Sequence, residues 1–261
     1  AGLGRTWIRM EGEAGDVVPD AVPTPSTSRA DEDIMICIDI DPEMGEPFGE
    51  PTGAMTRLEA IKQALNSFVL FKLGAFRKTA GHRIGVCVFS DEVNLVLEPT
   101  SDIDLATAMI GSIQITSTTS QQSFDFDKLL GAINRWFGPR LAQVPAHGPT
   151  VRAIAVYGRS HQIPLIKSDS ALLDQPRFWL DTLYAHRKVT KGNPDNLICQ
   201  DVLWLFEETF DSRSYILEVG GSQSRLQQHV MVLLSNPSQR DGQDHFHKKL
   251  EATKTVGGSL A

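Results

Sequence analysis

The chain has 261 residues, of which 41% are hydrophobic and 22% charged, so it is long and apolar enough to bury a core without disulfide or metal support. Its formal net charge of −7 disfavours a protein whose main activity is gripping phosphate backbones, because that requires a basic face, and we expect no direct nucleic-acid partner. No run approaches the ~20 apolar residues that span a bilayer, so we expect no membrane association.

The first half of the chain predicts an arm, a strand, a helix and a hairpin. Residues 1–32 are rich in Pro, Ser, Thr and acidic residues, and they predict a flexible N-terminal arm. Residues 34–38 (IMICI) are apolar on both faces, as in a central parallel strand, and apolar residues at helical spacing follow at 58–68. The strands predicted at 83–90 and 93–98 are separated by only two residues, which is hairpin spacing and makes this pair antiparallel.

The second half alternates helices and strands and ends in a polar segment. Helices are predicted at 103–113, 126–137, 198–206 and 226–234, a short and poorly defined one at 168–173, and strands at 151–157, 178–184 and 215–219. This order predicts an α/β domain over residues 33–234, with a mostly parallel central sheet, one antiparallel edge strand and helices on both faces. Residues 235–261 predict an extended C-terminal tail. Trp179 and Trp204 lie within apolar elements, where we expect core or interface anchors.

The three cysteines, Cys37, Cys87 and Cys199, lie in separate apolar runs without metal-ligand spacing. Their odd number and their surroundings argue against a disulfide framework or a zinc site. A reducing compartment therefore fits the chain better than an oxidising one.

Three carboxylates follow the first predicted strand: Asp39, Asp41 and Glu43, in the sequence DIDPE. At the carboxyl end of a buried parallel strand such a group suits a hard cation such as Mg²⁺, whereas the structural alternative is a polar turn broken by Pro42. An enzymatic interpretation is a haloacid-dehalogenase-like phosphatase, with Asp39 as nucleophile and Asp41 as general acid. That family needs a later acidic pair, and GRSH at 158–161, after the fourth strand, contains no carboxylate.

The hairpin region RIGVCVFSDEVNLVLEPTSDIDLATAMI resembles the corresponding stretch of the von Willebrand A family, and the order of elements is similar as well. In metal-binding members the first strand ends Asp-x-Ser-x-Ser, a Thr comes from the loop before the third helix, and an Asp follows the fourth strand. Asp39 matches this pattern. Asp41 and Glu43 stand in place of the serines, and Thr118 or Thr119 would supply the threonine.

The final aspartate of that pattern is replaced in this sequence by Gly158 or Arg159. A guanidinium near the site competes electrostatically with any divalent cation. The resemblance therefore implies a broken metal site with no bound metal, no cofactor and no catalytic residue. The degenerate site consists of Asp39, Asp41, Glu43 and Thr119.

A closer resemblance within that family is to the von Willebrand A-like scaffold subunits of the BRISC and BRCA-one-A deubiquitinase complexes. It is carried by ICIDIDPEM, VRAIAVYGRS and LLSNPSQRDGQDHF, and it covers the chain from about residue 33 onward. It implies a non-catalytic scaffold that stabilises a complex acting on ubiquitin chains, in the cytoplasm and nucleus, with roles in the DNA damage response and the cell cycle. The implied direct partner is the central scaffold subunit with ubiquitin-fold (UEV) domains. Through it the chain meets the zinc metalloprotease deubiquitinase and its pseudo-enzyme partner.

The C-terminal tail is a second implied contact with that partner. Pro237, Gln239 and Arg240 form a short extended peptide of the kind that docks into a groove at little ordering cost, and Phe246 completes the set. The structural alternative is a frayed terminus. We expect the change of Arg240 to Glu to weaken assembly without unfolding the domain. The runner-up function is a Mg²⁺-dependent phosphatase-like enzyme or a cation-dependent adhesion module that uses the three carboxylates.

Overall fold

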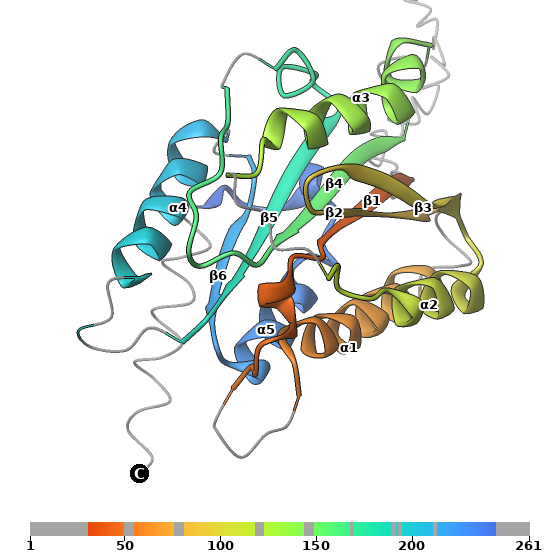
Figure 1. Ribbon diagram of the computed structural model, residues 1–261. Coiled ribbons are helices and arrows are strands. Elements are labelled where there is room, and N and C mark those ends of the chain that lie inside the picture. The colour runs from red at the N-terminus through yellow and green to blue at the C-terminus, as the bar shows by residue number, and fades with distance from the viewer. Residues whose placement is uncertain are drawn as a thin grey trace, which may run out of the picture.

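The centre of the molecule is a six-stranded sheet with the spatial order β3-β2-β1-β4-β5-β6 (Figure 1). The computed structural model describes residues 31–49, 55–75, 81–117, 123–143, 149–167, 170–188, 192, 195–210 and 213–243. The strands are β1 (Glu32–Asp39), β2 (Arg83–Phe89), β3 (Val93–Thr100), β4 (Thr150–Tyr157), β5 (Phe178–His186) and β6 (Ile216–Gly220). Every neighbouring pair is parallel except β2 and β3, which form the expected antiparallel hairpin at the edge of the sheet.

Helices cover both faces of this sheet, so the predicted α/β architecture is confirmed (Figure 1). One face carries α1 (Arg57–Val69), its π-helical continuation η2 (Leu70–Ala75), α2 (Ile103–Ser112) and α5 (Gln223–Val232). The other face carries α3 (Phe126–Gln143) and α4 (Asp195–Thr209). Two short 3₁₀ helices complete the described elements, η1 (Pro42–Gly45) after β1 and η3 (Pro237–Gln239) near the end of the described chain.

Strand β1 shows why the core has two halves. All eight of its residues are buried. Ile34, Ile36 and Ile38 pack on the side of α1, and Met35 and Cys37 pack on the side of α3. Because successive side chains of a strand point to opposite faces, a continuous apolar run is what a strand covered on both faces requires.

Some segments differ from the sequence expectations. Residues 171–174 form turns rather than the short helix expected at 168–173. Residues 235–243 do not extend away from the domain, because η3 starts there with a buried Pro237. Of the arm expected at 1–32, residues 1–30 lie outside the described residues, and β1 already begins at Glu32. Residues 244–261 also lie outside them. None of the described helices is long and apolar enough to cross a membrane.

Candidate functional site

The three carboxylates after β1 lie at the carboxyl edge of the sheet. Asp39 is the last residue of β1, and residues 158–161 directly follow β4. β1 and β4 are parallel and stay in register up to Ile38 and Val156, so the loops that leave both strands meet at the same edge. The structure therefore brings the DIDPE and GRSH segments together.

Asp39 is held by an arginine from the loop after β4. The side chains of Asp39 and Arg159 are both 0% exposed, and Arg159 Nε and Nη2 donate to the two carboxylate oxygens at 3.2 and 3.3 Å. The backbone N–H groups of Asp41 and Gly158 donate to the same carboxylate at 3.1 and 3.3 Å. Arg159 Nη2 also donates to the Ser90 carbonyl oxygen at 2.8 Å. Burial disfavours the charged guanidinium, but Asp39 outweighs burial and raises the pKa of Arg159, so this arginine stays charged.

The carboxylates of Asp41 and Glu43 bind other groups. Asp41 Oδ1 caps η1 by accepting from the backbone N–H of Glu43 at 3.0 Å. The Glu43 carboxylate accepts from Arg57 Nη1 at 3.1 Å and from the backbone N–H of Ser160 at 2.8 Å, and it lies 2.6 Å from His161 Nδ1. Burial would raise the pKa of Glu43, but Arg57 and the hydrogen bonds from Ser160 and His161 lower it to about 2. Glu43 is therefore ionised at neutral pH.

Gly158, the first residue after β4, is packed closely by its neighbours. Arg57, fully buried at the start of α1, donates to the Gly158 carbonyl oxygen as well as to Glu43. Met44 packs against Gly158 so closely that an added Cβ would lie 2.0 Å from its Sδ atom. An aspartate at position 158, as the metal-binding pattern has near this point, would therefore require the Met44 side chain to shift.

These residues do not fit a hard cation. Arg159 Nη1 lies 3.9 Å from Asp41 Oδ2 while Nε and Nη2 contact Asp39, so the guanidinium lies where a cation bridging both carboxylates would have to bind. Within the described part of the chain, no group of three His, Cys, Asp or Glu side chains is placed to hold a metal ion. Thr118 and Thr119 lie outside the described residues.

His186, the last residue of β5, is a protonated imidazole at the same edge of the sheet. Its Nδ1 lies 2.7 Å from the Arg187 carbonyl oxygen and its Nε2 lies 2.9 Å from Glu218 Oε1. Both partners are acceptors, so both ring nitrogens carry hydrogen. Burial would lower the pKa of His186, but hydrogen bonds with Cys199 and Glu218 outweigh it and raise the pKa to about 9.

A second buried ionic network lies toward the opposite edge, where the strands begin. Asp181 of β5 is 0% exposed, and Arg152 Nε of β4 donates to its Oδ2 at 2.6 Å. Arg240 donates to both Asp181 oxygens, and the backbone N–H of Tyr215 donates to Oδ1 at 2.8 Å. Burial would raise the pKa of Asp181, but the two arginines outweigh it and lower the pKa.

The same network extends to the start of the first strand. Arg152 Nη1 lies 3.6 Å from Glu32 Oε2, and it donates to the Leu233 carbonyl oxygen at 2.6 Å. Lys72 Nζ donates to Glu32 Oε1 at 2.6 Å and to the Leu234 carbonyl oxygen at 3.0 Å. Buried charges thus join β1, β4, β5 and η2 to the chain that follows α5.

This network fixes the segment that follows α5, which corrects the expectation of an extended tail from residue 235. The side chain of Arg240 is only 4% exposed, and its guanidinium lies 3.9 Å from the centre of the Tyr215 ring. Gln243 Oε1 accepts from the backbone N–H of Ile216 at 2.7 Å. The physical reason is that buried Asp181 recruits a second cation, which ties the segment to its own domain.

Of the residues expected to bind a partner, Pro237 is buried and Arg240 is bound to Asp181, whereas Gln239 is exposed. The expectation that Arg240 is available to a partner is therefore corrected. Phe246 lies outside the described residues.

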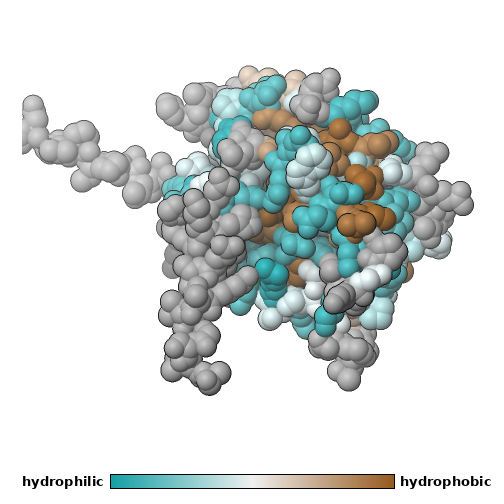
Figure 2. Space-filling view, turned by 90° about the vertical axis from the view of Figure 1, so that its left-hand side faces the viewer, coloured by the Kyte–Doolittle hydropathy of each residue, from teal (hydrophilic) through white to brown (hydrophobic). Residues whose placement is uncertain are grey.

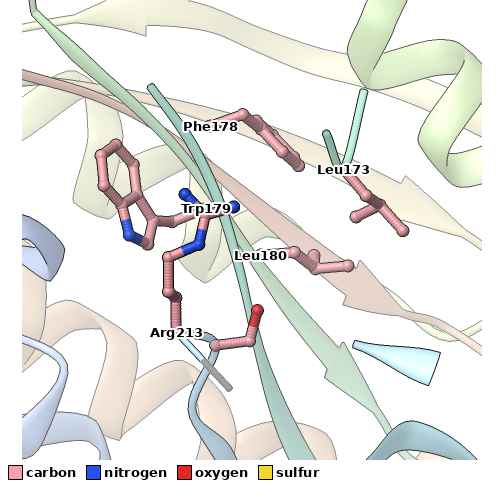
Figure 3. Close-up of a pocket in the computed structure, with 6 residues that line it drawn as sticks. Leu173, Phe178, Trp179, Leu180 and Arg213 are labelled. Carbon is pink, nitrogen blue, oxygen red and sulfur yellow. The ribbon is translucent and has the colours of Figure 1, made fainter. Parts of the chain in front are cut away.

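The two tryptophans singled out from the sequence have different surroundings. Trp179 is half-buried at the start of β5, where the Arg213 guanidinium lies 5.9 Å from its ring centre, at a shallow pocket lined also by Leu173, Phe178 and Leu180 (Figure 3). Trp204 of α4 is 60% exposed, so it is not part of the core.

Several buried charges were not expected from the sequence, among them Arg57, Arg152 and Asp181. A signal was present for two of them, because Arg152 and Asp181 interrupt the apolar strand sequences VRAIAVY and FWLDTLY. A charged residue in a fully buried strand requires a partner of opposite charge. Arg57 had no such signal, since the first turn of a helix is ordinarily solvated.

Comparisons with known proteins agree on the fold. No protein-family model matches the chain, and no curated protein matches it in sequence. Among solved structures it is similar to the BatB protein from Bacteroides thetaiotaomicron, with 17% identity, 77% of this chain and 96% of that chain covered, and a TM-score of 0.52. It is also similar to the SpRpn10 VWA domain, with 13% identity, 80% and 98% coverage and a TM-score of 0.50. A von Willebrand factor type A protein from Catenulispora acidiphila matches at 13% identity, 81% and 44% coverage and a TM-score of 0.50.

The chain therefore has the von Willebrand A-like α/β fold. At these identities the likeness concerns the fold alone. In this chain the carboxyl edge of β1 is occupied by the ion pair between Arg159 and Asp39.

Proposed function

We propose that this chain is a non-catalytic scaffold subunit of a BRISC- or BRCA-one-A-type deubiquitinase complex. The observation that carries the non-catalytic part is the Arg159–Asp39 ion pair, whose two side chains are 0% exposed. A guanidinium buried on the leading carboxylate leaves no charge for a cation or a reactant to balance. The function then lies in the surface of the domain, and no cofactor takes part in it.

The stretches that carry the sequence resemblance support the proposal by where they lie. ICIDIDPEM forms β1 and η1, and VRAIAVYGRS forms β4 and contains Arg159, so the two together build the closed site. LLSNPSQRDGQDHF begins at the end of α5 and contains Arg240, the second cation on Asp181. The stretches that carry the resemblance therefore contain residues of both buried ionic networks.

In the proposed assembly this chain binds the central scaffold subunit with UEV domains, in the cytoplasm and nucleus. A separate zinc metalloprotease, held with its pseudo-enzyme partner in the same complex, cleaves ubiquitin chains. This chain stabilises the assembly without touching the reacting atoms.

Co-expression with the UEV scaffold subunit, the metalloprotease and the pseudo-enzyme tests the proposal. We expect the full chain to co-elute with the complex on size exclusion, and the complex formed without it to dissociate at lower concentration. A variant that lacks residues 244–261 tests whether this terminal segment contributes to binding of the complex. It keeps Arg240, which stays bound to Asp181. Elution of the chain by itself, with no effect on the complex, would contradict the proposal.

Calorimetry with Mg²⁺ and Mn²⁺ on the full chain tests the runner-up function. We expect no saturable heat, because Arg159 lies between Asp39 and Asp41. Asp91→Ala, which removes an exposed carboxylate from the β2–β3 turn, is the matched control for Asp39→Ala. Tight binding that Asp39→Ala abolishes and Asp91→Ala leaves intact would favour the cation-dependent alternative.

A further inference from the structure

Helix α4 covers the sheet with one side and exposes large apolar residues on the other. Cys199, Val202 and Phe206 are buried in the core, whereas Leu197 is 72% and Trp204 60% exposed. The exposed pair is two helical turns apart, so both side chains lie on the same side of the helix. A tryptophan and a leucine held together on a rigid helix, away from the core, are typical of a contact surface.

Acidic residues of the same helix lie next to this apolar pair. Asp201 lies between Leu197 and Trp204 on the same side, and Glu207 and Glu208 are exposed in the last turn of the helix. The sequence of α4, DNLICQDVLWLFEET, contains no Lys, Arg or His. Figure 2 looks onto the side of the molecule that carries α4, and there apolar residues are interspersed with hydrophilic ones.

We propose that the outer face of α4, defined by Leu197, Asp201, Trp204 and Glu208, binds a basic amphipathic helix of a partner protein. Leu197 and Trp204 are separated by about 10.5 Å along the helix axis, at about 1.5 Å per residue. A facing helix with two apolar residues seven positions apart has the same separation and packs against both. Lysine or arginine beside those residues meets Asp201 and Glu208.

The charge of the face argues against two other occupants. A second copy of this chain would bring one acidic helix against another, and like charges across an interface are repulsive. An anionic membrane surface attracts basic segments and repels this one. The inference rests on the proposed function only in that a scaffold has partner proteins, and it is tested without the deubiquitinase complex.

The test is a titration of the full chain with a labelled 18-residue Leu/Lys model helix that has leucines at heptad spacing, followed by fluorescence anisotropy at physiological salt. The control peptide carries Glu at every Lys position. We expect the Lys peptide to bind and the Glu peptide not to bind. Trp204→Ala should weaken binding by about tenfold or more, and Asp201→Lys should weaken it further. Leu105→Ala, which removes a 45% exposed leucine from α2, should leave the affinity unchanged.

The inference is overturned if the Lys peptide does not bind, and three other outcomes would overturn it as well. Equal binding by the parent chain and Trp204→Ala would show attraction by net charge alone. Much tighter binding by a chain that ends at Gln243 would assign the face to this chain's own terminal residues. A dimer that Trp204→Ala dissociates would assign it to a second copy. Failure of the peptide to bind would not contradict the scaffold proposal. Failure of the chain to co-elute with the deubiquitinase complex would not contradict the inference about α4.

Discussion

Replacing Arg159 with Leu removes the cation from a carboxylate that has no access to water. Asp39 then keeps only two backbone N–H donors, from Asp41 and Gly158, and its side chain is 0% exposed. The variant escapes the cost of a buried charge by protonating Asp39 in the folded state. Protonating a carboxyl whose ordinary pKa is about 3.9 costs about 4 kcal/mol at pH 7 and about 1.5 kcal/mol at pH 5. Because burial already raises the pKa of Asp39 in the parent chain, despite Arg159, these values are upper limits on the loss in the free energy of unfolding at each pH.

The sign of the pH dependence follows from the same step. The folded variant holds a proton that the unfolded chain releases, so its stability falls relative to the parent as pH rises above the pKa that burial has already raised for Asp39 in the parent. At pH 7 the loss corresponds to a melting temperature lower by roughly 8–16 °C. Urea unfolding of both chains between pH 5 and pH 8 measures it, and Asp39→Asn in the Arg159→Leu background should restore most of the lost stability. A pH-independent loss below about 1 kcal/mol would refute the reasoning.

Two further predictions concern buried charges elsewhere in the domain. Arg240→Glu places a negative charge beside fully buried Asp181 and should lower the free energy of unfolding by about 3 kcal/mol or more. The control Gln239→Glu, on the exposed neighbour, should change it by less than about 0.5 kcal/mol. Similar unfolding midpoints for the two variants would contradict this prediction. The raised pKa of His186, about 9, contributes stability that is complete below about pH 6.5 and is lost as pH rises through about 9. Glu218→Gln should flatten that part of the pH–stability curve, and an unchanged slope would assign it to another group.

The strands and their faces were predictable from sequence because burial on both sides leaves a simple pattern. The run IMICI has no polar position and falls in the middle of the sheet, and the three residues between β2 and β3 are too few for anything but a hairpin. The DIDPE carboxylates and the arginine after β4 were also visible as a group, because parallel strands end at a common edge.

The partners of the individual charges were not predictable, because they are set by three-dimensional register. Nothing local in the sequence indicates that Glu43 turns to Arg57, 14 positions away, or that Arg240 reaches Asp181, 59 positions away. The polar composition of residues 235–243 suggested an extended tail. The buried Asp181 carboxylate in β5 needs a cation, and its pairing with Arg240 overrides that local preference. A sequence pattern does not reveal a pairing between residues so far apart.

The ionic network at the start of the strands also has a consequence for the order in which the domain forms during synthesis. Lys72 binds a carbonyl oxygen 162 positions later, and Arg152 binds one 81 positions later. Until those residues and Arg240 have left the ribosome, Lys72, Arg152 and Asp181 lack part of their compensation, and contacts of such sequence separation form slowly. Because Arg240 is a partner of Asp181 in β5, we expect the network to be complete only after translation has passed Arg240.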